Sequence, residues 1–266
     1  MSEVPVSISV VLTINDRDPG TVADVLYSLD GQGQAETIVV LDGTPRELKE
    51  RVHTQLATGE FGRVDTPEIV RAPGWLSPVK AMNVGFGHAR ADLLYVLSSD
   101  VVQSAGNVQT ATRLVAGYGK PVVLFGRAEC SCGPRGREVV WPDGAPGNLL
   151  VSADHPRPLG FIMCLPRATM EAVGGFDERF ASGYWYDDDD LVRRLWDVGA
   201  DFLFDDTVGG VHQHHERPVL ELPHGQAGIL RNQAAMMEKW GDLQPIHRVP
   251  KLVRRLPGRT VWTHAG

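Results

Sequence analysis

The sequence has few cysteines, no long apolar run and no excess of positive charge, and each absence excludes a class of protein. Three cysteines, Cys130, Cys132 and Cys164, form no paired disulfide framework, so we expect reduced thiols in a cytoplasmic protein. No apolar stretch approaches the length of a membrane-spanning helix. A formal net charge of -7 gives no general attraction to nucleic acid. The composition favours one globular, enzyme-sized domain.

Several well-known motifs are missing as well. The first predicted strand is followed by Asn15-Asp16-Arg17, where a dinucleotide-binding protein would carry a Gly-x-Gly-x-x-Gly turn. The chain also lacks a phosphate-binding Walker loop and a Gly-x-Ser-x-Gly nucleophile turn. Dehydrogenase, kinase and hydrolase functions are therefore disfavoured together.

Apolar segments with strand character alternate with segments of helical periodicity. Residues 7–13 (SISVVLT) are β-branched and almost entirely apolar, which is typical of a strand buried on both faces of a parallel sheet. The same reasoning predicts strands over 37–41, 93–97, 122–127, 159–165, 202–204 and 208–211, and helices over 22–29, 45–57, 79–89, 105–116, 188–198 and 225–240. This order predicts an α/β fold with a mixed, mostly parallel sheet flanked by helices, in which ligands bind where the parallel strands end.

We expect a single domain over residues 1–243, whose two halves meet near residue 100. A Gly- and Pro-rich stretch over 133–147 reads as a long loop. Residues 244–266 contain the basic cluster Arg248, Lys251, Arg254, Arg255 and Arg259, and two prolines there favour a solvated, partly flexible tail. Contact of this basic tail with an anionic acceptor or a membrane surface is the alternative.

Four consecutive aspartates, Asp187 to Asp190, precede Leu191, Leu195 and Val198, so they occupy the first turn of an amphipathic helix. A carboxylate there is stabilised by the helix dipole by about 0.3–1 kcal/mol, but capping needs only one or two. Four adjacent carboxylates repel one another, and in a cleft this repulsion raises at least one pKa toward the range useful for a general base. Helix capping is the structural interpretation and proton transfer the functional one.

Asp100 and a histidine-rich segment are candidates for a metal site. Asp100 follows Ser98 and Ser99 at the end of a predicted strand, which places a hard oxygen ligand at the sheet edge. In a strand, His212 and His214 would share one face and could offer two imidazoles to one ion. An ordinary surface histidine cluster is the alternative.

Lys80 and Asn83 lie near the start of the predicted helix over 79–89. A cation and the exposed N–H groups of a helix N-terminus suit a diphosphate, whereas an ordinary exposed lysine is the simpler interpretation.

Taken in order, these segments resemble the inverting glycosyltransferases of the GT-A type, especially family 2, with local similarity to β-1,4-galactosyltransferases and bacterial chondroitin polymerase domains. The most specific match is residues 174–178 (GGFDE) followed by 185–191 (WYDDDDL), which resemble the family's Gly-Gly-Phe-Asp-Glu and Trp-Gly-Glu-Asp-x-Asp-Leu blocks. Residues 38–44 (IVVLDGT) resemble Val-Val-Asp-Asp-Gly-Ser, with Leu41 in place of the first aspartate. Ser98 stands where the first aspartate of the metal-binding Asp-x-Asp is expected.

The resemblance implies a role for particular residues of this chain. Asp188 is the expected general base, and Trp185, Asp187 and Asp189 are expected near the acceptor. A divalent ion, Mn²⁺ or Mg²⁺, would be bound by Asp100 and His212, or by His214 if the register shifts by two residues. Donor-binding positions would be Thr13, Asn15, Arg17, Asp42, Lys80, Asn83, Ser98, Ser99 and Asp100.

The implied reaction is the inverting transfer of a sugar from a nucleotide-sugar, with a UDP-sugar favoured, to a carbohydrate or other hydroxyl acceptor in polysaccharide or glycoconjugate synthesis. Residues 1–100 would be the nucleotide-binding half and 101–243 the acceptor-binding half. Two alternatives stay open. One is a non-catalytic nucleotide-binding subunit, because Leu41 and Ser98 replace carboxylates. The other is a sugar-phosphate nucleotidyltransferase, although Asn15-Asp16-Arg17 does not resemble its glycine- and arginine-rich loop.

Overall fold

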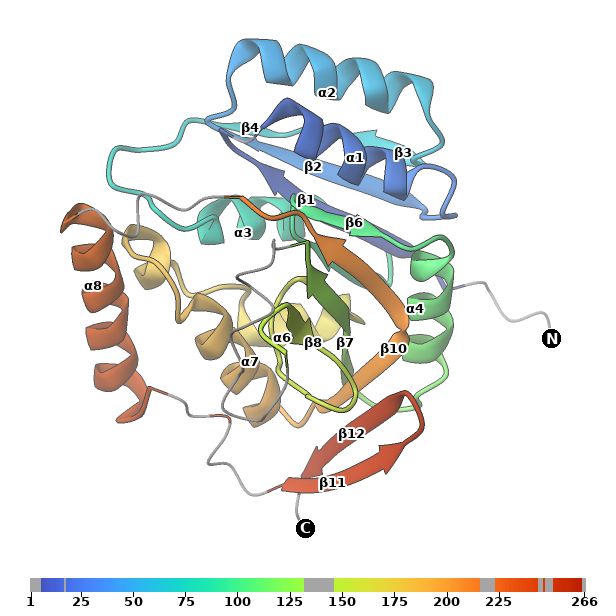
Figure 1. The fold of residues 1–266 in the computed structure, drawn as a ribbon, viewed down its shortest axis with the longest axis vertical. Coiled ribbons are helices and arrows are strands. Elements are labelled where there is room, and N and C mark those ends of the chain that lie inside the picture. The colour runs from blue at the N-terminus through green and yellow to red at the C-terminus, as the bar shows by residue number, and fades with distance from the viewer. Residues whose placement is uncertain are drawn as a thin grey trace.

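The computed structural model describes residues 6–16, 18–131, 146–215, 223–243, 246 and 251–264 (Figure 1). The strands are β1 (Ile8–Ile14), β2 (Glu36–Asp42), β3 (Arg63–Asp65), β4 (Glu68–Ile69), β5 (Leu93–Leu97), β6 (Val101–Gln103), β7 (Val122–Cys130), β8 (Leu149–Val151), β9 (Ile162–Pro166), β10 (Asp201–His212), β11 (Lys251–Leu256) and β12 (Arg259–His264). The helices are α1 (Pro19–Leu29), α2 (Arg46–Thr58), α3 (Val79–His88), α4 (Asn107–Ala116), α6 (Arg167–Val173), the 3₁₀ helix η1 (Glu178–Ser182), α7 (Asp187–Asp197) and α8 (Pro223–Trp240).

The strands form one mixed sheet. Its order is β11-β12-β10-β7-β9-β5-β1-β2-β3, and β4, β6 and β8 pair with β2, β10 and β7. β5, β1 and β2 run parallel, and so do β7 and β10, while β9 is antiparallel to both β5 and β7. The C-terminal ends of β1, β2, β5, β7 and β10 therefore meet at one edge of the sheet, where ligands bind in open α/β folds.

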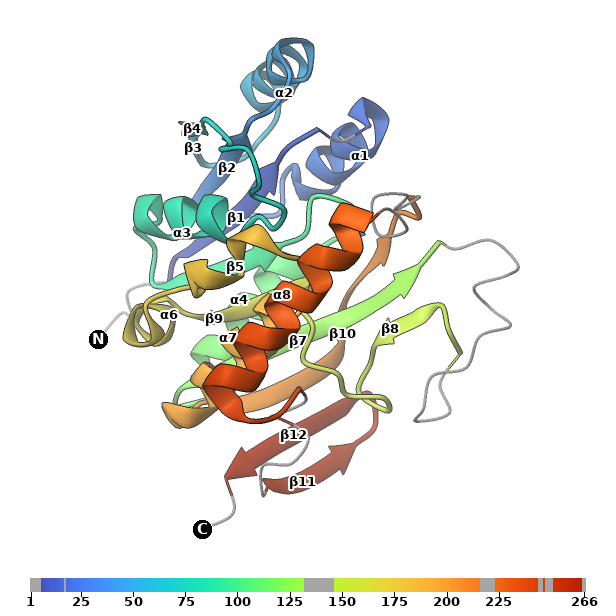
Figure 2. The same ribbon diagram turned by 90° about the vertical axis from the view of Figure 1, so that its left-hand side faces the viewer.

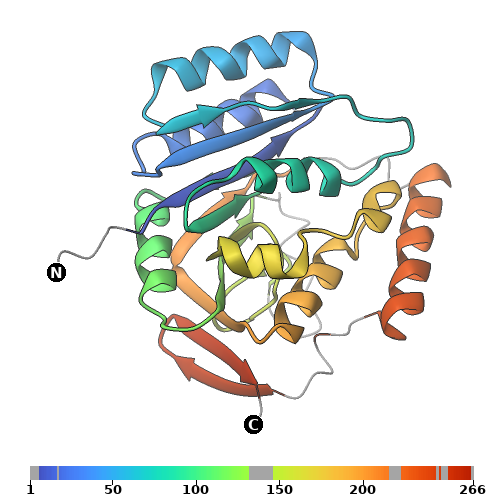
Figure 3. The same ribbon diagram turned by 180° about the vertical axis from the view of Figure 1, so that it is seen from behind.

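Each face of the sheet is covered by its own helices and has its own apolar core. Alternation along β1 sends Val10 and Leu12 into a core with α1, α2 and α4, and sends Val11 into a core with α3, α6 and α7. Figure 2 shows α1 and α2 on the opposite side of β1 and β2 from α3. From behind, in Figure 3, α3 (teal) and α6 (yellow) lie in front of the sheet, with α8 (orange) at its side. The predicted α/β architecture is confirmed.

Two regions differ from the sequence-based expectation. The predicted strands over 202–204 and 208–211 are parts of one strand, β10, which is interrupted by an irregularity between Asp205 and Gly209. The composition of the basic segment after residue 243 predicts a solvated, partly flexible tail, but β11 and β12 form a hairpin that extends the sheet beside β10. Most of the loop expected over 133–147 lies outside the described residues.

Among the helices that the structure describes, none is long and apolar enough to cross a membrane.

Candidate active site and metal centre

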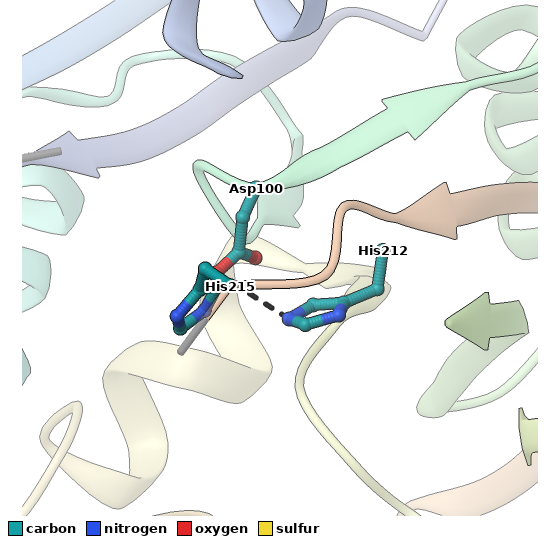
Figure 4. A group of neighbouring side chains, drawn as sticks. All are labelled: Asp100, His212 and His215. Carbon is teal, nitrogen blue, oxygen red and sulfur yellow. Dashed lines mark hydrogen bonds and ion pairs between the residues drawn. The ribbon is translucent and has the colours of Figure 1, made fainter. Parts of the chain in front are cut away.

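Asp100, His212 and His215 come together at the sheet edge (Figure 4). Asp100 lies between β5 and β6, and His212 ends β10, where it pairs opposite Val101 of β6. The Nε2 atoms of His215 and His212 are 3.1 and 3.5 Å from Asp100 Oδ2. Asp100 and His212 are buried and His215 is partly buried. The turn from β5 into β6 and the end of β10 thus bring one carboxylate and two imidazoles together.

The chemistry of this cluster fits a divalent metal ion. The cluster's ligand atoms lie within 4.8 Å of one another. His212 is buried, yet within the described residues neither of its ring nitrogens makes a hydrogen bond. A buried polar atom without a hydrogen bond is costly, and an ion between His212 and Asp100 would be bound by the imidazole in place of that bond. One carboxylate with two imidazoles is a ligand set that suits Mn²⁺, Fe²⁺ or Zn²⁺ better than Mg²⁺.

The sequence predicted Asp100 and His212 but missed His215. The prediction of His214 assumed that the strand continues, whereas β10 ends at His212 and the Gln213 N–H donates to the Asp100 carbonyl at 2.7 Å. His214 instead donates its backbone N–H to Ser131 Oγ at 2.8 Å, and its Nδ1 lies 3.9 Å from Cys130 Sγ. The structure therefore places His215, and not His214, beside Asp100.

The cysteines only partly meet the expectation of reduced thiols. Cys164 is a free, buried thiol, and burial raises its pKa above the range of a reactive nucleophile. Cys130 is disulfide-bonded, so the expectation is wrong for this residue. Cys132 lies outside the described residues.

Ser98 takes part in the site even though it is not a carboxylate. Its hydroxyl donates to Asp100 Oδ1 at 2.6 Å, and its backbone N–H donates to the Phe161 carbonyl at 3.1 Å. Ser98 thus orients the Asp100 carboxylate, where a second aspartate would repel it. Ser99 is also buried, at the same turn.

Asp42 lies at the C-terminal end of β2, on the same edge of the sheet. It is buried and ion-paired with Arg71, a residue that the sequence reasoning did not single out. Burial raises the pKa of the Asp42 carboxyl, and the Arg71 charge opposes this shift. Its Oδ1 atom has no hydrogen-bond partner within the described residues. Asp42 therefore has an acceptor oxygen to offer to a ligand.

The remaining donor candidates near β1 have less defined surroundings. Thr13 is buried near the end of β1, and Asn15 follows that strand and is partly buried. Arg17 lies outside the described residues.

Lys80 and Asn83 lie on α3 but differ in what they contact. The Lys80 ammonium lies over the Trp75 ring, 4.4 Å from its centre, and 3.4 Å from Glu178 Oε2. Asn83 accepts a hydrogen bond from the Phe176 N–H at 2.8 Å and donates to the Phe176 carbonyl at 3.0 Å. Asn83 therefore fixes the Gly-Gly-Phe turn, while the Lys80 cation is partly exposed at the start of the helix.

The four aspartates occupy the first turn of α7, as predicted, and each has a different environment. Ser77 Oγ donates to Asp187 at 2.7 Å, and the Gly160 N–H donates a long bond of 3.4 Å to Asp188 Oδ2. Asp190 is fully buried, where Arg194 Nε and Trp240 Nε1 donate to it at 2.8 and 3.0 Å. Asp190 thus has a structural role, whereas Asp188 accepts the weakest hydrogen bond of these three aspartates.

The environments of Asp187, Asp188 and Asp189 favour their protonated forms. Burial, followed by the charges of Asp187 and Asp189, raises the pKa of Asp188 to about 7. Burial and the Asp187 charge raise the pKa of Asp189 to about 6. Burial also raises the pKa of Asp187, against the Ser77 hydrogen bond. Repulsion between the carboxylates therefore contributes to the raised pKa values as expected, but burial is the larger cause of the shifts.

The two residues before this run have backbone conformations that are unusual for aromatic side chains. Trp185 and Tyr186 have φ angles of 64° and 65°, the left-handed region that favours glycine, and the family block has glycine at the Tyr186 position. Buried Asn232 of α8 holds this turn by donating to the Trp185 carbonyl at 2.9 Å. The strained turn leaves the Trp185 side chain 52% exposed next to the aspartates.

Searches with the sequence against family models and curated proteins find no match. Residues 1–349 of S. aureus TarS, in complex with UDP-GlcNAc, have a similar structure, with a TM-score of 0.59 and 13% identity over 79% of this chain and 59% of that one. A mannosyltransferase from Pyrobaculum calidifontis, in complex with GDP-Man and Mn²⁺, gives a TM-score of 0.59 and 16% identity over 89% of this chain and 65% of that one.

This chain therefore spans less than two thirds of the length of either protein. At such low identity the similarity concerns the fold. The chain has the GT-A fold of glycosyltransferases, which the motif resemblance implied.

Proposed function

We propose that this chain is a metal-dependent, inverting glycosyltransferase that uses a nucleotide-sugar donor and has Asp188 as its general base. The observation that carries the proposal is the Gly160–Phe161 segment, which contacts both Asp188 and the candidate metal ligand His212. The Gly160 N–H donates to Asp188, and the Phe161 ring lies 5.3 Å from the His212 ring, centre to centre. The carboxylate with a pKa of about 7 and the metal ligands therefore flank the same short segment.

A second series of contacts supports the proposed position of the donor's nucleobase. Asp42 is ion-paired with Arg71, and Arg71 Nη2 donates to the Ser77 carbonyl at 3.5 Å. Ser77 Oγ in turn donates to Asp187, the neighbour of Asp188. In the proposal, Asp42 accepts a hydrogen bond from the nucleobase, and Lys80 lies where its charge attracts the diphosphate.

Each residue then has a defined task. Asp100, His212 and His215 would hold a divalent ion, which when bound stabilises the negative charge of the leaving diphosphate. Asp188 accepts the proton of the acceptor hydroxyl, and the exposed face of Trp185 packs against the acceptor. A single displacement requires no covalent enzyme intermediate and inverts the anomeric centre. A Mn²⁺ ion and a nucleotide-sugar in the mannosyltransferase complex support this assignment.

The proposal is tested by incubating the purified chain with UDP-, GDP- and dTDP-sugars, with Mn²⁺ or with chelator, and measuring release of nucleoside diphosphate. We expect slow hydrolysis of one donor class with Mn²⁺, with a UDP-sugar favoured by the motif resemblance, and faster release when an acceptor is present. Nucleotide binding without release under any condition would favour a non-catalytic subunit. Formation of pyrophosphate from a nucleoside triphosphate would favour a nucleotidyltransferase.

The raised pKa of Asp188 predicts how turnover depends on pH. A general base acts in its deprotonated form, so kcat should rise with pH and level off above an apparent pKa near 7. The charges of Asp187 and Asp189 contribute to this raised pKa, because each disfavours the charged form of Asp188. Rates at saturating donor from about pH 5 to 9 test this, and a flat profile would contradict Asp188 as the base.

A further inference from the structure

The C-terminal hairpin carries large apolar side chains on its surface. β12 pairs with β10 of the central sheet, and β11 forms the outer strand of the hairpin. On this strand Leu252, Val253 and Leu256 are 59%, 48% and 41% exposed. Three large, exposed apolar side chains on one short strand are more than the scattered apolar residues that a protein surface ordinarily shows.

A groove of about 590 Å³ lies between this hairpin and α4. The residues that line it include Arg113 of α4, Leu252, Arg254 and Leu256 of β11, and Arg259 of β12. The set includes three arginines and no carboxylate. The whole chain has 33 acidic and 26 basic residues, so this surface has the opposite charge from the protein as a whole. An apolar, cationic surface on an acidic protein indicates an anionic, amphiphilic partner.

Two of the lining arginines are available to such a partner. The third lining arginine, Arg259, is already ion-paired with Asp205 at 2.5 Å. Arg113 and Arg254 are exposed, and within the described residues neither side chain makes an ion pair or hydrogen bond. They would bind phosphate groups without first breaking a contact within the protein.

We propose that the β11–β12 hairpin and α4 form a docking surface for an anionic phospholipid bilayer. Leu252 and Leu256 enter the headgroup region, and Arg113 and Arg254 bind lipid phosphates. A soluble anion would satisfy the arginines but leave the leucines exposed, and a neutral apolar partner would leave the arginines unused. The hairpin lies at the opposite end of the molecule from α2 (Figures 1 and 2).

Cosedimentation with vesicles tests the proposal independently of any transferase activity. At low ionic strength, the chain should bind vesicles of equal parts phosphatidylglycerol and phosphatidylcholine, but not vesicles of phosphatidylcholine alone. The double variant Arg113→Gln/Arg254→Gln should bind on the order of 30-fold more weakly, at about fivefold for each basic residue. Leu252→Ser/Leu256→Ser should also weaken binding, and added salt should weaken it further.

The matched control is Arg46→Gln/Arg51→Gln on α2, which changes the net charge equally at the opposite end of the molecule. This variant should bind vesicles like the unaltered chain. Equal losses in both arginine double variants, or no binding to phosphatidylglycerol vesicles at low salt, would overturn the proposal. A dimer in gel filtration that Leu252→Ser/Leu256→Ser dissociates would also overturn it, in favour of a second copy of this chain.

Discussion

Replacing Asp188 by Asn is expected to lower turnover by about 10²–10⁴-fold while donor binding stays nearly unchanged. Asn keeps the size of the side chain at the start of α7 but removes the group that would accept the acceptor proton. Single-turnover rates and donor affinity measured by calorimetry separate the two effects. Unchanged turnover with normal donor binding would eliminate Asp188 as the base.

The same substitution should raise stability at alkaline pH. The native state keeps the Asp188 proton up to about pH 7, whereas the unfolded chain loses it near its ordinary value of 3.8. Between these values only the native state binds the proton, so stability falls as pH rises, and the charged carboxylate is least favourable above pH 7. At pH 8, Asp188→Asn should therefore be more stable by roughly 1–3 kcal/mol in urea unfolding.

Asp197→Asn is the control on the same helix. Asp197 lies at the end of α7, 3.0 Å from Arg193 Nε, and is exposed. Its substitution should change stability by less than about 0.5 kcal/mol and leave turnover intact. Lower activity together with higher stability would therefore be specific to Asp188, whereas a merely structural role would lower both.

The second large effect is expected at His212. His212→Ala removes one of the three candidate metal ligands, so affinity for Mn²⁺ should fall by at least roughly 100-fold, more than the loss of an outer hydrogen bond usually costs. The rate at which the enzyme turns over the nucleotide-sugar donor should fall together with the affinity for Mn²⁺. Electron paramagnetic resonance of free Mn²⁺ measures the affinity directly, without any need for an acceptor.

Two further variants make this test specific. Asp100→Asn keeps the shape of the buried side chain but removes its charge, and should weaken Mn²⁺ binding as severely as His212→Ala. His214→Ala is the matched histidine control, because His214 lies against Cys130 and outside the cluster, and it should change the affinity by less than about threefold. A large loss for His214→Ala with little effect of His212→Ala would refute the assigned ligand set.

The sequence predicted the elements whose periodicity is strong. β1 is buried along its whole length, and a run rich in apolar and β-branched residues indicates such a strand without reference to the rest of the chain. The spacing of Leu191, Leu195 and Val198 predicts a helix whose first turn holds the four aspartates. Four carboxylates are more than capping needs, which favours a role in proton transfer. The raised pKa of Asp188 agrees with that reasoning, but its main cause, burial, depends on packing that only the fold provides.

Features that depend on where strands end or pair were harder to predict. His215 joins the metal cluster because β10 stops at His212, and a difference of one or two residues in that boundary changes which histidine faces Asp100. Arg71 reaches Asp42 from a loop 29 residues away in sequence. No local pattern indicates such a contact.

The C-terminal hairpin did leave a signal in the sequence. Pro257-Gly258 is a turn pair, Gly258 has a φ of 65°, and Thr260 and Trp262 alternate with more exposed residues along β12. The basic residues and prolines of this segment favour a solvated tail by composition, and this signal opposes the strand pattern. Arg254 and Arg255 are exposed there, where charges also discourage pairing of the outer strand with other chains.

Calorimetric titration of the purified chain with UDP, GDP and dTDP, each in the presence of Mn²⁺ and of chelator, tests the central claim most directly. The account predicts that one of these nucleotides binds in the presence of Mn²⁺, that chelator abolishes the binding, and that Asp100→Asn removes it. Absence of binding by all three nucleotides with Mn²⁺, or binding that chelator and Asp100→Asn leave unchanged, would contradict a metal-dependent nucleotide-sugar site at this edge of the sheet.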